Sequence, residues 1–157
     1  REDGDIVLDD PFEELLVEGD RPRHSCVVYD SLAAPTPYDE GWEWQKQALE
    51  RLTEHPDDLS EPDVVLLTQH DAVFTLGTAS TLDNLKFSPY EAPFDVVRTE
   101  RGGEVTYHGP GQIVMYPIMN LRRYRQDIHW YLRALEETVI RTLAKLGLRG
   151  ERIKGLT

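Results

Sequence analysis

Five short apolar runs lie between residues 63 and 121 of this 157-residue chain, and the last four are separated by segments that contain glycine or proline. Because the runs are short and several are rich in β-branched residues, the pattern predicts β-strands. A long amphipathic stretch, 127–146, follows them. Strands in succession followed by such a helix predict an α+β fold, a mixed β-sheet flanked by helices. The expected strands are 63–68, 73–76, 94–99, 104–107 and 113–121, with one helical turn at 82–87.

Two further elements are expected nearer the N-terminus. The apolar run 25–30 predicts a strand, and a helix is predicted from residue 36 or 39 to about residue 54. The expected buried face of that helix carries Tyr38, Trp42, Gln45, Leu49 and Leu52. In the C-terminal helix, Asp127 is expected as the N-cap and Gly147 as the stop. Its expected apolar stripe is Ile128, Tyr131, Leu132, Leu135, Val139, Leu143 and Leu146.

The net charge of −12 is unevenly distributed. Residues 1–63 carry 5 basic and 19 acidic side chains, whereas residues 64–157 carry 12 basic and 10 acidic ones. We interpret residues 1–23 as an acidic, loosely attached N-terminal extension. An acidic surface of this kind repels phosphate backbones, so the charge argues against a nucleic-acid partner.

Membrane, disulfide and metal chemistry are not indicated. No apolar run approaches the ~20 residues that a membrane span needs. The single cysteine, Cys26, cannot form an internal disulfide, and its place in an apolar run favours a small buried hydrophobic residue over a nucleophile. The five histidines are too far apart in sequence for a local zinc motif, so no metal and no cofactor are expected.

The segment 101–116, RGGEVTYHGPGQIVMY, concentrates the residues suited to a site. Two glycine-rich places eight residues apart predict a hairpin whose backbone N–H groups a ligand can approach closely. Arg101, Thr106, Tyr107 and His108 add a cation, a hydroxyl, an aromatic ring and an imidazole. An ordinary hairpin with turn glycines and a surface histidine explains the pattern equally well. The P-loop and dinucleotide-binding patterns are absent from the segment.

The longer run RGGEVTYHGPGQIVMYPIMNLRR, 101–123, resembles the motif of the lipoyl(octanoyl) transferases. The segments QHDAVFTLG (69–77), DIHWYLRALE (127–136) and GLT (155–157) extend the resemblance over residues 25–157. The resemblance implies the biotin and lipoate protein ligase fold and an acyltransferase of lipoate biosynthesis and protein lipoylation. Family members move an octanoyl group from acyl carrier protein, through a cysteine thioester, to a lysine. That lysine belongs to a lipoyl domain of a 2-oxoacid dehydrogenase or to the glycine-cleavage H protein.

The family's cysteine and activating lysine follow the Gly-Leu-Thr segment, beyond Thr157, so the resemblance assigns no catalytic residue to this chain. We therefore expect residues 24–157 to be the N-terminal part of one octanoyltransferase domain, incomplete at the C-terminus and inactive alone. Lys154 precedes the family's lysine and is expected at the surface. The start at Arg1 also predicts a longer natural protein. The implied substrate-binding residues are Arg101, Gly102, Gly103, Glu104, Val105, Thr106, Tyr107 and His108.

The resemblance also implies that His70 lines the active-site mouth, and it suggests the same for Tyr38. A turn histidine at a strand end and a packing tyrosine at a helix start are the structural alternatives. The basic residues Arg98, Arg122, Arg123 and Arg125 form either a docking rim for the acidic carrier protein or a solvated loop.

Two other functions fit parts of the pattern. One is an ATP-dependent lipoate or biotin ligase, although such ligases carry a third glycine and an H-D-x-G-N run where this chain has His108-Gly-Pro-Gly-Gln112. The other is a non-catalytic module that binds an acyl group or a lipoyl domain. The segment 127–137 is closest to the plant and algal branch, which favours a plastid or mitochondrion, with the bacterial cytoplasm as the alternative.

Overall fold

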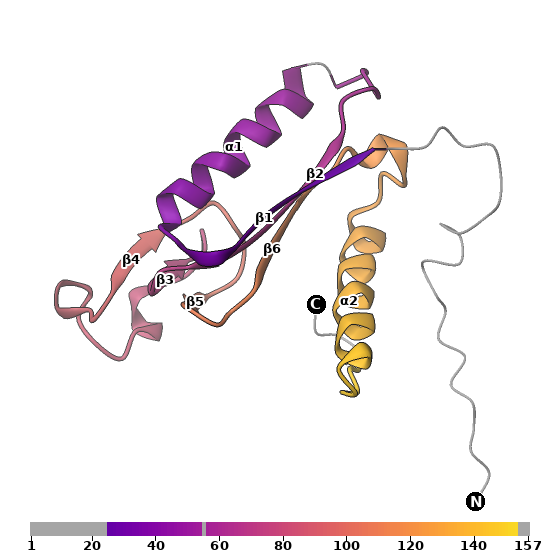
Figure 1. The fold of residues 1–157 in the computed structure, drawn as a ribbon. Helices are drawn as coiled ribbons and strands as arrows, with labels where there is room; N and C mark the ends of the chain where they lie inside the picture. Colours follow the sequence, from indigo (N-terminus) through magenta and orange to yellow (C-terminus); the bar gives the residue numbers. More distant parts are fainter. Residues whose placement is uncertain (1–24, 55, 154–157) are drawn as a thin grey trace, which may run out of the picture. The chain divides into compact units, whose positions relative to one another are not determined.

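The computed structural model describes residues 25–54 and 56–153, which fall into two compact units divided between Asn120 and Leu121. Figure 1 shows the elements along the chain. The segment 1–23, expected to be an extension, lies outside the described residues, as do Lys154 and the Gly-Leu-Thr segment that ends at Thr157. The domain limits of 24 and 157, and the place of the family's cysteine and lysine beyond Thr157, therefore stay predictions.

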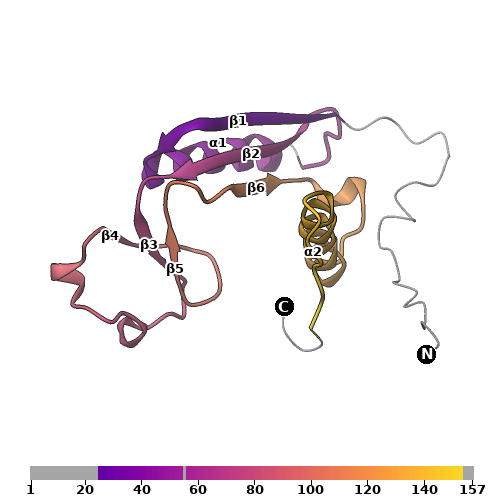
Figure 2. The same ribbon diagram turned by 60° about the horizontal axis from the view of Figure 1, so that its bottom comes forward.

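The unit before Leu121 contains a three-stranded mixed sheet in the order β1–β2–β6. Its strands are β1 (Cys26–Thr36), β2 (Asp63–His70) and β6 (Val114–Ile118). β2 pairs in parallel with β1 and antiparallel with β6, and α1 (Tyr38–Glu54) lies along the sheet (Figures 1 and 2). The core between them consists of Ala48, Val64 and Leu66, with Trp44, Tyr116 and Ile118 packed against it.

A second three-stranded mixed sheet in the same unit has the order β4–β3–β5. Its strands are β3 (Val73–Leu76), β4 (Asp95–Arg98) and β5 (Val105–His108). The connection from β3 to β4 contains two short 3-10 turns, η2 (Leu82–Asn84) and η3 (Pro89–Glu91). Mixed sheets with helices define the α+β fold that the sequence predicts, but as two sheets and not one.

The hairpin predicted for residues 101–116 is wrong. β5 pairs with β3 in one sheet, and β6 pairs with β2 in the other. The chain crosses from one sheet to the other at residues 71–72 and crosses back at 109–113. The pairing of β6 with β2 places Tyr116 opposite Leu66 and Ile118 opposite Val64, so both side chains can pack on the core beneath α1. Burial of these apolar side chains explains why β6 joins β2 and not β5.

Element boundaries agree with the sequence in places and differ in others. β3 has the predicted bounds, η2 is the predicted single turn, and Pro117 lies on an edge strand as expected. β1 is longer than predicted, because it continues through a register shift to Thr36. The face predicted for α1 is wrong at Leu49, which is 54% exposed. Leu52 is buried as predicted, and the other buried residues are Gly41 and Ala48, which are small enough to let the helix approach the sheet closely.

The unit that begins at Leu121 contains η4 (Leu121–Arg123) and α2 (Ile128–Lys145). The Asp127 carboxylate accepts hydrogen bonds from the backbone N–H groups of His129 (2.9 Å) and Trp130 (3.1 Å), which confirms the predicted N-cap. Gly147 has a φ of 76°, a left-handed conformation that confirms the predicted helix stop.

The apolar stripe predicted for α2 is not its buried face. Val139 is more than half exposed, whereas Ala134 and Glu137 are buried. Arg152 accounts for the burial of Glu137, because its guanidinium donates to Glu136 (3.1 Å) and Glu137 (2.6 Å) and ties the segment after α2 to that side of the helix. Across residues 25–54 and 56–153, no helix has the length and apolar character needed to cross a bilayer.

Candidate active site

Four rings gather where β2 and β5 end and the chain passes between the two sheets. They are Tyr38 at the start of α1, His70 at the end of β2, His108 at the end of β5 and Tyr116 in β6. The centre of the His70 ring lies 5.1 Å from that of Tyr38, 5.9 Å from His108 and 5.8 Å from Tyr116. We call these four residues the ring cluster.

His70 is fully buried and held through both ring nitrogens. Its Nδ1 lies 3.1 Å from the backbone carbonyl oxygen of Thr36, and its Nε2 lies 2.8 Å from the hydroxyl of Tyr116. Burial lowers the pKa of His70, and the neighbouring His108 lowers it further, while the bond to Thr36 opposes the shift. The imidazole is therefore neutral and fixed in orientation at pH 7.

His108 is held in a similar way by two side chains. Its Nδ1 lies 2.6 Å from Oε1 of Gln112, and its Nε2 lies 3.3 Å from Oγ1 of Thr75. Desolvation lowers the pKa of His108 most, the Gln112 hydrogen bond opposes the shift, and the positive charge of Arg101 lowers the pKa further. The second imidazole is thus also neutral at pH 7.

Arg101 fixes the turn before β5 against β3. Its guanidinium donates to the Thr75 carbonyl oxygen and hydroxyl, both at 2.8 Å, and to the Glu104 carbonyl oxygen at 2.9 Å. Gly103 has a φ of 82°, and its carbonyl oxygen occupies the space that a side chain at Gly77 would need. Gly103 therefore has the positive φ that glycine allows, and Gly77 allows its close backbone approach, whereas the approach of a ligand to this turn stays a prediction.

The turn after β5 is fixed by Gln69 of β2. The Gly111 N–H donates to Oε1 of Gln69 (2.8 Å), and Nε2 of Gln69 donates to the Leu32 carbonyl oxygen (2.6 Å). Gly111 has a φ of 91°, which favours glycine at this position. Gln69 thus connects β1 with the turn that carries Gln112 to His108.

The two tyrosines of the ring cluster are uncharged. Burial raises the pKa of the Tyr38 hydroxyl, although the Arg101 charge lowers it in part. Burial also raises the pKa of Tyr116, and Tyr38 adds to that shift. The ring cluster is therefore a set of four neutral polar groups beside one cation.

The structure brings together Tyr38, His70, Arg101 and His108 of the predicted site residues. Thr106 pairs with Thr75 across the sheet. It lies on the same face of the sheet as His108, because the two residues are two positions apart in β5. Tyr107 lies on the other face, where its ring centre is 5.4 Å from Phe74 and 5.9 Å from Phe94. Glu104 accepts a hydrogen bond from Asn84 (2.6 Å) outside the ring cluster. The remaining predicted residues, Gly102, Gly103 and Val105, belong to the backbone of the turn and the start of β5.

Sequence reasoning gave no role to Gln69, Thr75, Gln112 or Tyr116, although all four stand inside the segments compared with the family. Three of them contact residues that are far away in sequence. The separation is 33 residues for Thr75 and His108, 46 for Tyr116 and His70, and 42 for Gln69 and Gly111. One feature of the sequence points to two of these residues. Gln69 and Gln112 are polar residues directly beside a histidine and a glycine of the family segments.

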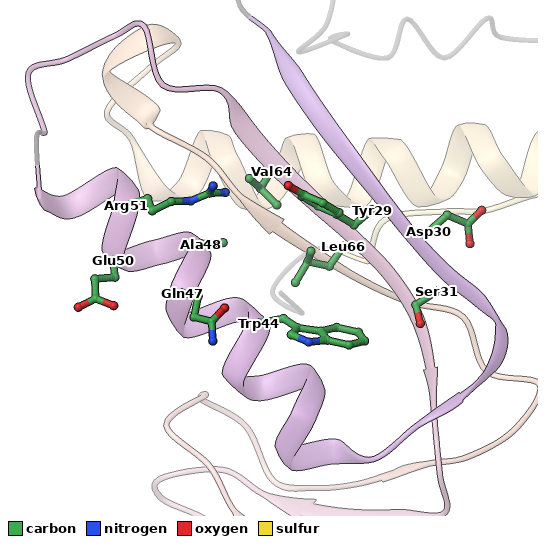
Figure 3. A pocket seen from close by; sticks show the side chains of 10 residues that line it. All are labelled: Tyr29, Asp30, Ser31, Trp44, Gln47, Ala48, Glu50, Arg51, Val64 and Leu66. Atoms are coloured by element: carbon green, nitrogen blue, oxygen red, sulfur yellow. The ribbon is translucent and has the colours of Figure 1, made fainter.

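A groove of about 600 Å³ lies between α1 and the sheet β1–β2–β6 (Figure 3). Trp44 and Ala48 line it from α1, and Tyr29, Val64 and Leu66 line it from the strands. None of its lining residues belongs to the ring cluster. Among the residues that the structure describes, no group of three histidine, cysteine or acidic side chains could hold a metal ion.

Cys26 is exposed, so its interpretation as a buried hydrophobic residue is wrong. It begins β1, whereas Thr36, which contacts His70, ends the same strand. Ten residues of strand at about 3.3 Å each separate the two by roughly 30 Å. Partial burial and the Asp63 carboxylate raise the pKa of the Cys26 thiol. The cysteine is therefore remote from the ring cluster and poorly ionised.

The basic residues proposed as a docking rim have local structural partners. Arg98 donates to the carbonyl oxygens of Gly77 (3.1 Å) and Ser80 (3.2 Å). Arg123 is buried, which contradicts a place on an exposed rim. Arg125 lies 3.5 Å from the Asp127 carboxylate. These contacts stabilise the connection after β3 and the start of α2.

Comparison with known proteins identifies the family. Residues 37–155 match the model of the lipoyl protein ligase A/B catalytic domain, and the chain belongs to this family. A solved structure of protein Ta0514 from T. acidophilum, described as a putative lipoate protein ligase with bound lipoic acid, has a similar fold. The TM-score is 0.54 at 15% identity over 87% of this chain and 54% of that one. The likeness confirms the expected ligase-type fold.

The curated relatives are octanoyltransferases. The chain is 55% identical over 120 residues to that of Synechococcus elongatus, covering 76% of this chain and 50% of the relative. It is 49% identical over 138 residues to a chloroplastic octanoyltransferase of Arabidopsis thaliana, covering 87% of this chain and 49% of the relative. The chain thus spans about half the length of these relatives.

Proposed function

We propose that this chain is the acyl-binding part of an octanoyltransferase, which transfers an octanoyl group from acyl carrier protein to a lysine of a lipoyl domain. The observation that carries the proposal is the 49–55% identity to octanoyltransferases over a region that includes every residue of the ring cluster. The acceptors are the lipoyl domains of 2-oxoacid dehydrogenases or the glycine-cleavage H protein.

The substrate-binding surface in this proposal is the segment Arg101–His108, with Tyr38 and the fully buried His70 at the mouth. Within the segment, the Tyr107 side chain lies on the other sheet face and that of Glu104 outside the ring cluster. The Tyr38 hydroxyl can donate to a thioester oxygen, and Nε2 of His108 can accept from a pantetheine amide N–H, both without the desolvation cost of charged groups. The remote, poorly ionised Cys26 is not assigned the acyl-thioester step, and no other cysteine is present in the chain. The transfer step itself is therefore assigned to no residue up to Thr157, and no cofactor is invoked.

The cellular compartment is part of the same proposal. The chloroplastic relative supports a plastid, and the relative from Synechococcus elongatus is compatible with a bacterial cytoplasm. The similarity of the segment 127–137 to the plant and algal branch favours an organelle.

Binding of octanoyl-acyl carrier protein to the chain tests the proposal directly. We expect measurable affinity by calorimetry and about tenfold weaker binding for His108→Ala, the equivalent of about 1.4 kcal/mol or one good hydrogen bond. His129→Ala, on the exposed side of α2, is the matched control and should bind as the unaltered chain does. Equal affinity of His108→Ala and the control would exclude His108 from the substrate-binding surface.

An ATP-dependent ligase makes the opposite prediction. Incubation of the chain with octanoate and ATP should yield no acyl-adenylate, whereas a ligase would release pyrophosphate. Pyrophosphate release that needs octanoate would overturn the transferase proposal in favour of the ligase.

A further inference from the structure

The hydrogen bonds of Gln112 have only one consistent direction. One end of its side-chain amide lies 3.2 Å from the Tyr107 carbonyl oxygen, and this oxygen can only accept. That end is therefore the NH₂ group, and the other end, 2.6 Å from Nδ1 of His108, is the amide oxygen. Because an amide oxygen cannot donate, the hydrogen of this bond must belong to Nδ1 of His108.

The opposite side of the His108 ring agrees with this direction. A neutral imidazole has one N–H, so with the hydrogen on Nδ1 the Nε2 atom carries a lone pair. Thr75 Oγ1 lies 3.3 Å from Nε2 and already accepts a hydrogen bond from Arg101 at 2.8 Å. Its own hydroxyl hydrogen is free to point at Nε2. Donors and acceptors thus alternate correctly from Arg101 through Thr75 and His108 to Gln112.

We propose that Gln112 is a positioning residue that fixes the tautomer of His108, with the hydrogen on Nδ1 and the lone pair of Nε2 directed toward Thr75. Gln69 supports this role, because its amide oxygen accepts from Gly111, the residue before Gln112, at 2.8 Å. The other end of the Gln69 amide donates to the Leu32 carbonyl oxygen at 2.6 Å, so its direction is fixed as well.

His70 has the same tautomer for a different reason. Its Nδ1 lies 3.1 Å from the backbone carbonyl oxygen of Thr36, which can only accept, so this nitrogen also carries the hydrogen. Nε2 then accepts from the Tyr116 hydroxyl at 2.8 Å. The group that fixes His70 is backbone, and the group that fixes His108 is a side chain. Only the tautomer of His108 can therefore be changed by substitution at Gln112.

The fixed tautomer gives His108 a defined role within the proposed function, on which this step rests. Nε2 can accept a hydrogen bond but cannot donate one, so it selects a substrate group that carries a hydrogen, such as a pantetheine amide N–H. The bond from Thr75 is longer than the bond to Gln112, at 3.3 Å against 2.6 Å, and is the one that an incoming donor can replace. The shorter bond to Gln112 keeps the ring in place during that exchange.

Nitrogen NMR of the full 157-residue chain, labelled with ¹⁵N-histidine, tests the proposal without substrate. The shifts of the two ring nitrogens distinguish an N–H nitrogen from one that carries a lone pair. We expect His70 and His108 both to show the hydrogen on Nδ1 at pH 7. In Gln112→Leu the His108 signals should move toward a mixture of the two tautomers, whereas in Gln112→Glu, which keeps an oxygen acceptor, the hydrogen should stay on Nδ1.

His70 serves as the reference inside the same molecule, and Gln47→Leu, an exposed glutamine of α1, is the matched control. Neither His70 nor the control should show a change of tautomer. The proposal is overturned if His108 carries its hydrogen on Nε2 in the unaltered chain, or if Gln112→Leu leaves its tautomer unchanged. It is also overturned if Gln112→Leu alters both histidines, since that outcome shows a general structural role. Failure to bind octanoyl-acyl carrier protein would instead count against the proposed function alone.

Discussion

A Cβ atom added to Gly41 would lie 2.7 Å from Cε1 of His70, closer than side chains approach one another in proteins. Gly41 is in the first turn of α1, and His70 is the last residue of β2. The imidazole cannot retreat, because Thr36 holds its Nδ1 and Tyr116 holds its Nε2. The start of α1 and the orientation of His70 therefore depend on each other.

Replacing Gly41 with alanine should destabilise the chain despite the better helix propensity of alanine. The overlap with a fully buried, doubly bonded imidazole should lower the free energy of unfolding by about 1–3 kcal/mol, after a propensity gain of up to about 1 kcal/mol. Urea denaturation followed by circular dichroism measures the change.

Gly102→Ala provides the matched control, because no atom beyond the residue and its two chain neighbours lies within 4 Å of a Cβ at that position. Its free energy of unfolding should change by less than about 0.5 kcal/mol. If Gly41→Ala proved as stable as this control, the close contact would not constrain the site.

Local signals in the sequence predicted the elements better than their pairing. The cap at Asp127 and the positive φ of Gly147 depend on residues next to each other in sequence, and both are confirmed. The assignment of β5 and β6 to different sheets depends on burial of Tyr116 and Ile118 against residues of β2, about fifty positions away. No local pattern encodes that choice, so the nearer partner was predicted and was wrong.

The candidate site shows the same difference between local signals and long-range contacts. His70, His108 and Tyr38 were singled out from the family motif, and the structure places their rings within 6.3 Å of one another. The polar residues that hold the two histidines were missed, since Thr75 is 33 positions from His108 and Tyr116 is 46 positions from His70. Only folded geometry shows that these side chains meet.

Stability should fall as the pH decreases below about 6.5, the ordinary histidine pKa. Burial lowers the pKa values of His70 and His108 in the folded chain, so near this pH the unfolded chain binds protons that the folded chain does not. The loss should begin near pH 6.5, continue to the lowered folded pKa values, and be absent above about pH 7.5. Urea midpoints at several pH values measure this loss of stability.

His70→Gln should flatten the pH dependence of stability, and His129→Gln should not. An equal slope in both variants would contradict the assignment of this dependence to His70.

The ion pairs of Arg152 should stabilise the unit that begins at Leu121. Its guanidinium lies 3.1 Å from Glu136 and 2.6 Å from Glu137, and its side chain is only 21% exposed. Arg152→Met leaves the buried Glu137 carboxylate with fewer partners and should cost about 1–3 kcal/mol. Arg149→Met breaks the exposed pair with Glu151 and should cost less than about 1 kcal/mol. Thermal melting compares the two; equal costs would show that burial of the Arg152 pairs is unimportant.

Cys26 should remain unacylated when the chain is incubated with octanoyl-acyl carrier protein. The raised pKa keeps its sulfur as the thiol, and the thiolate is the nucleophile in thioester exchange. Its place at the start of β1 also separates it from the ring cluster by the length of the strand. Intact-mass spectrometry should therefore find no added octanoyl group, and Cys26→Ser should bind the acyl carrier protein with unchanged affinity. An octanoyl adduct that forms on the unaltered chain and is lost in Cys26→Ser would assign the acyl-thioester step to Cys26 after all.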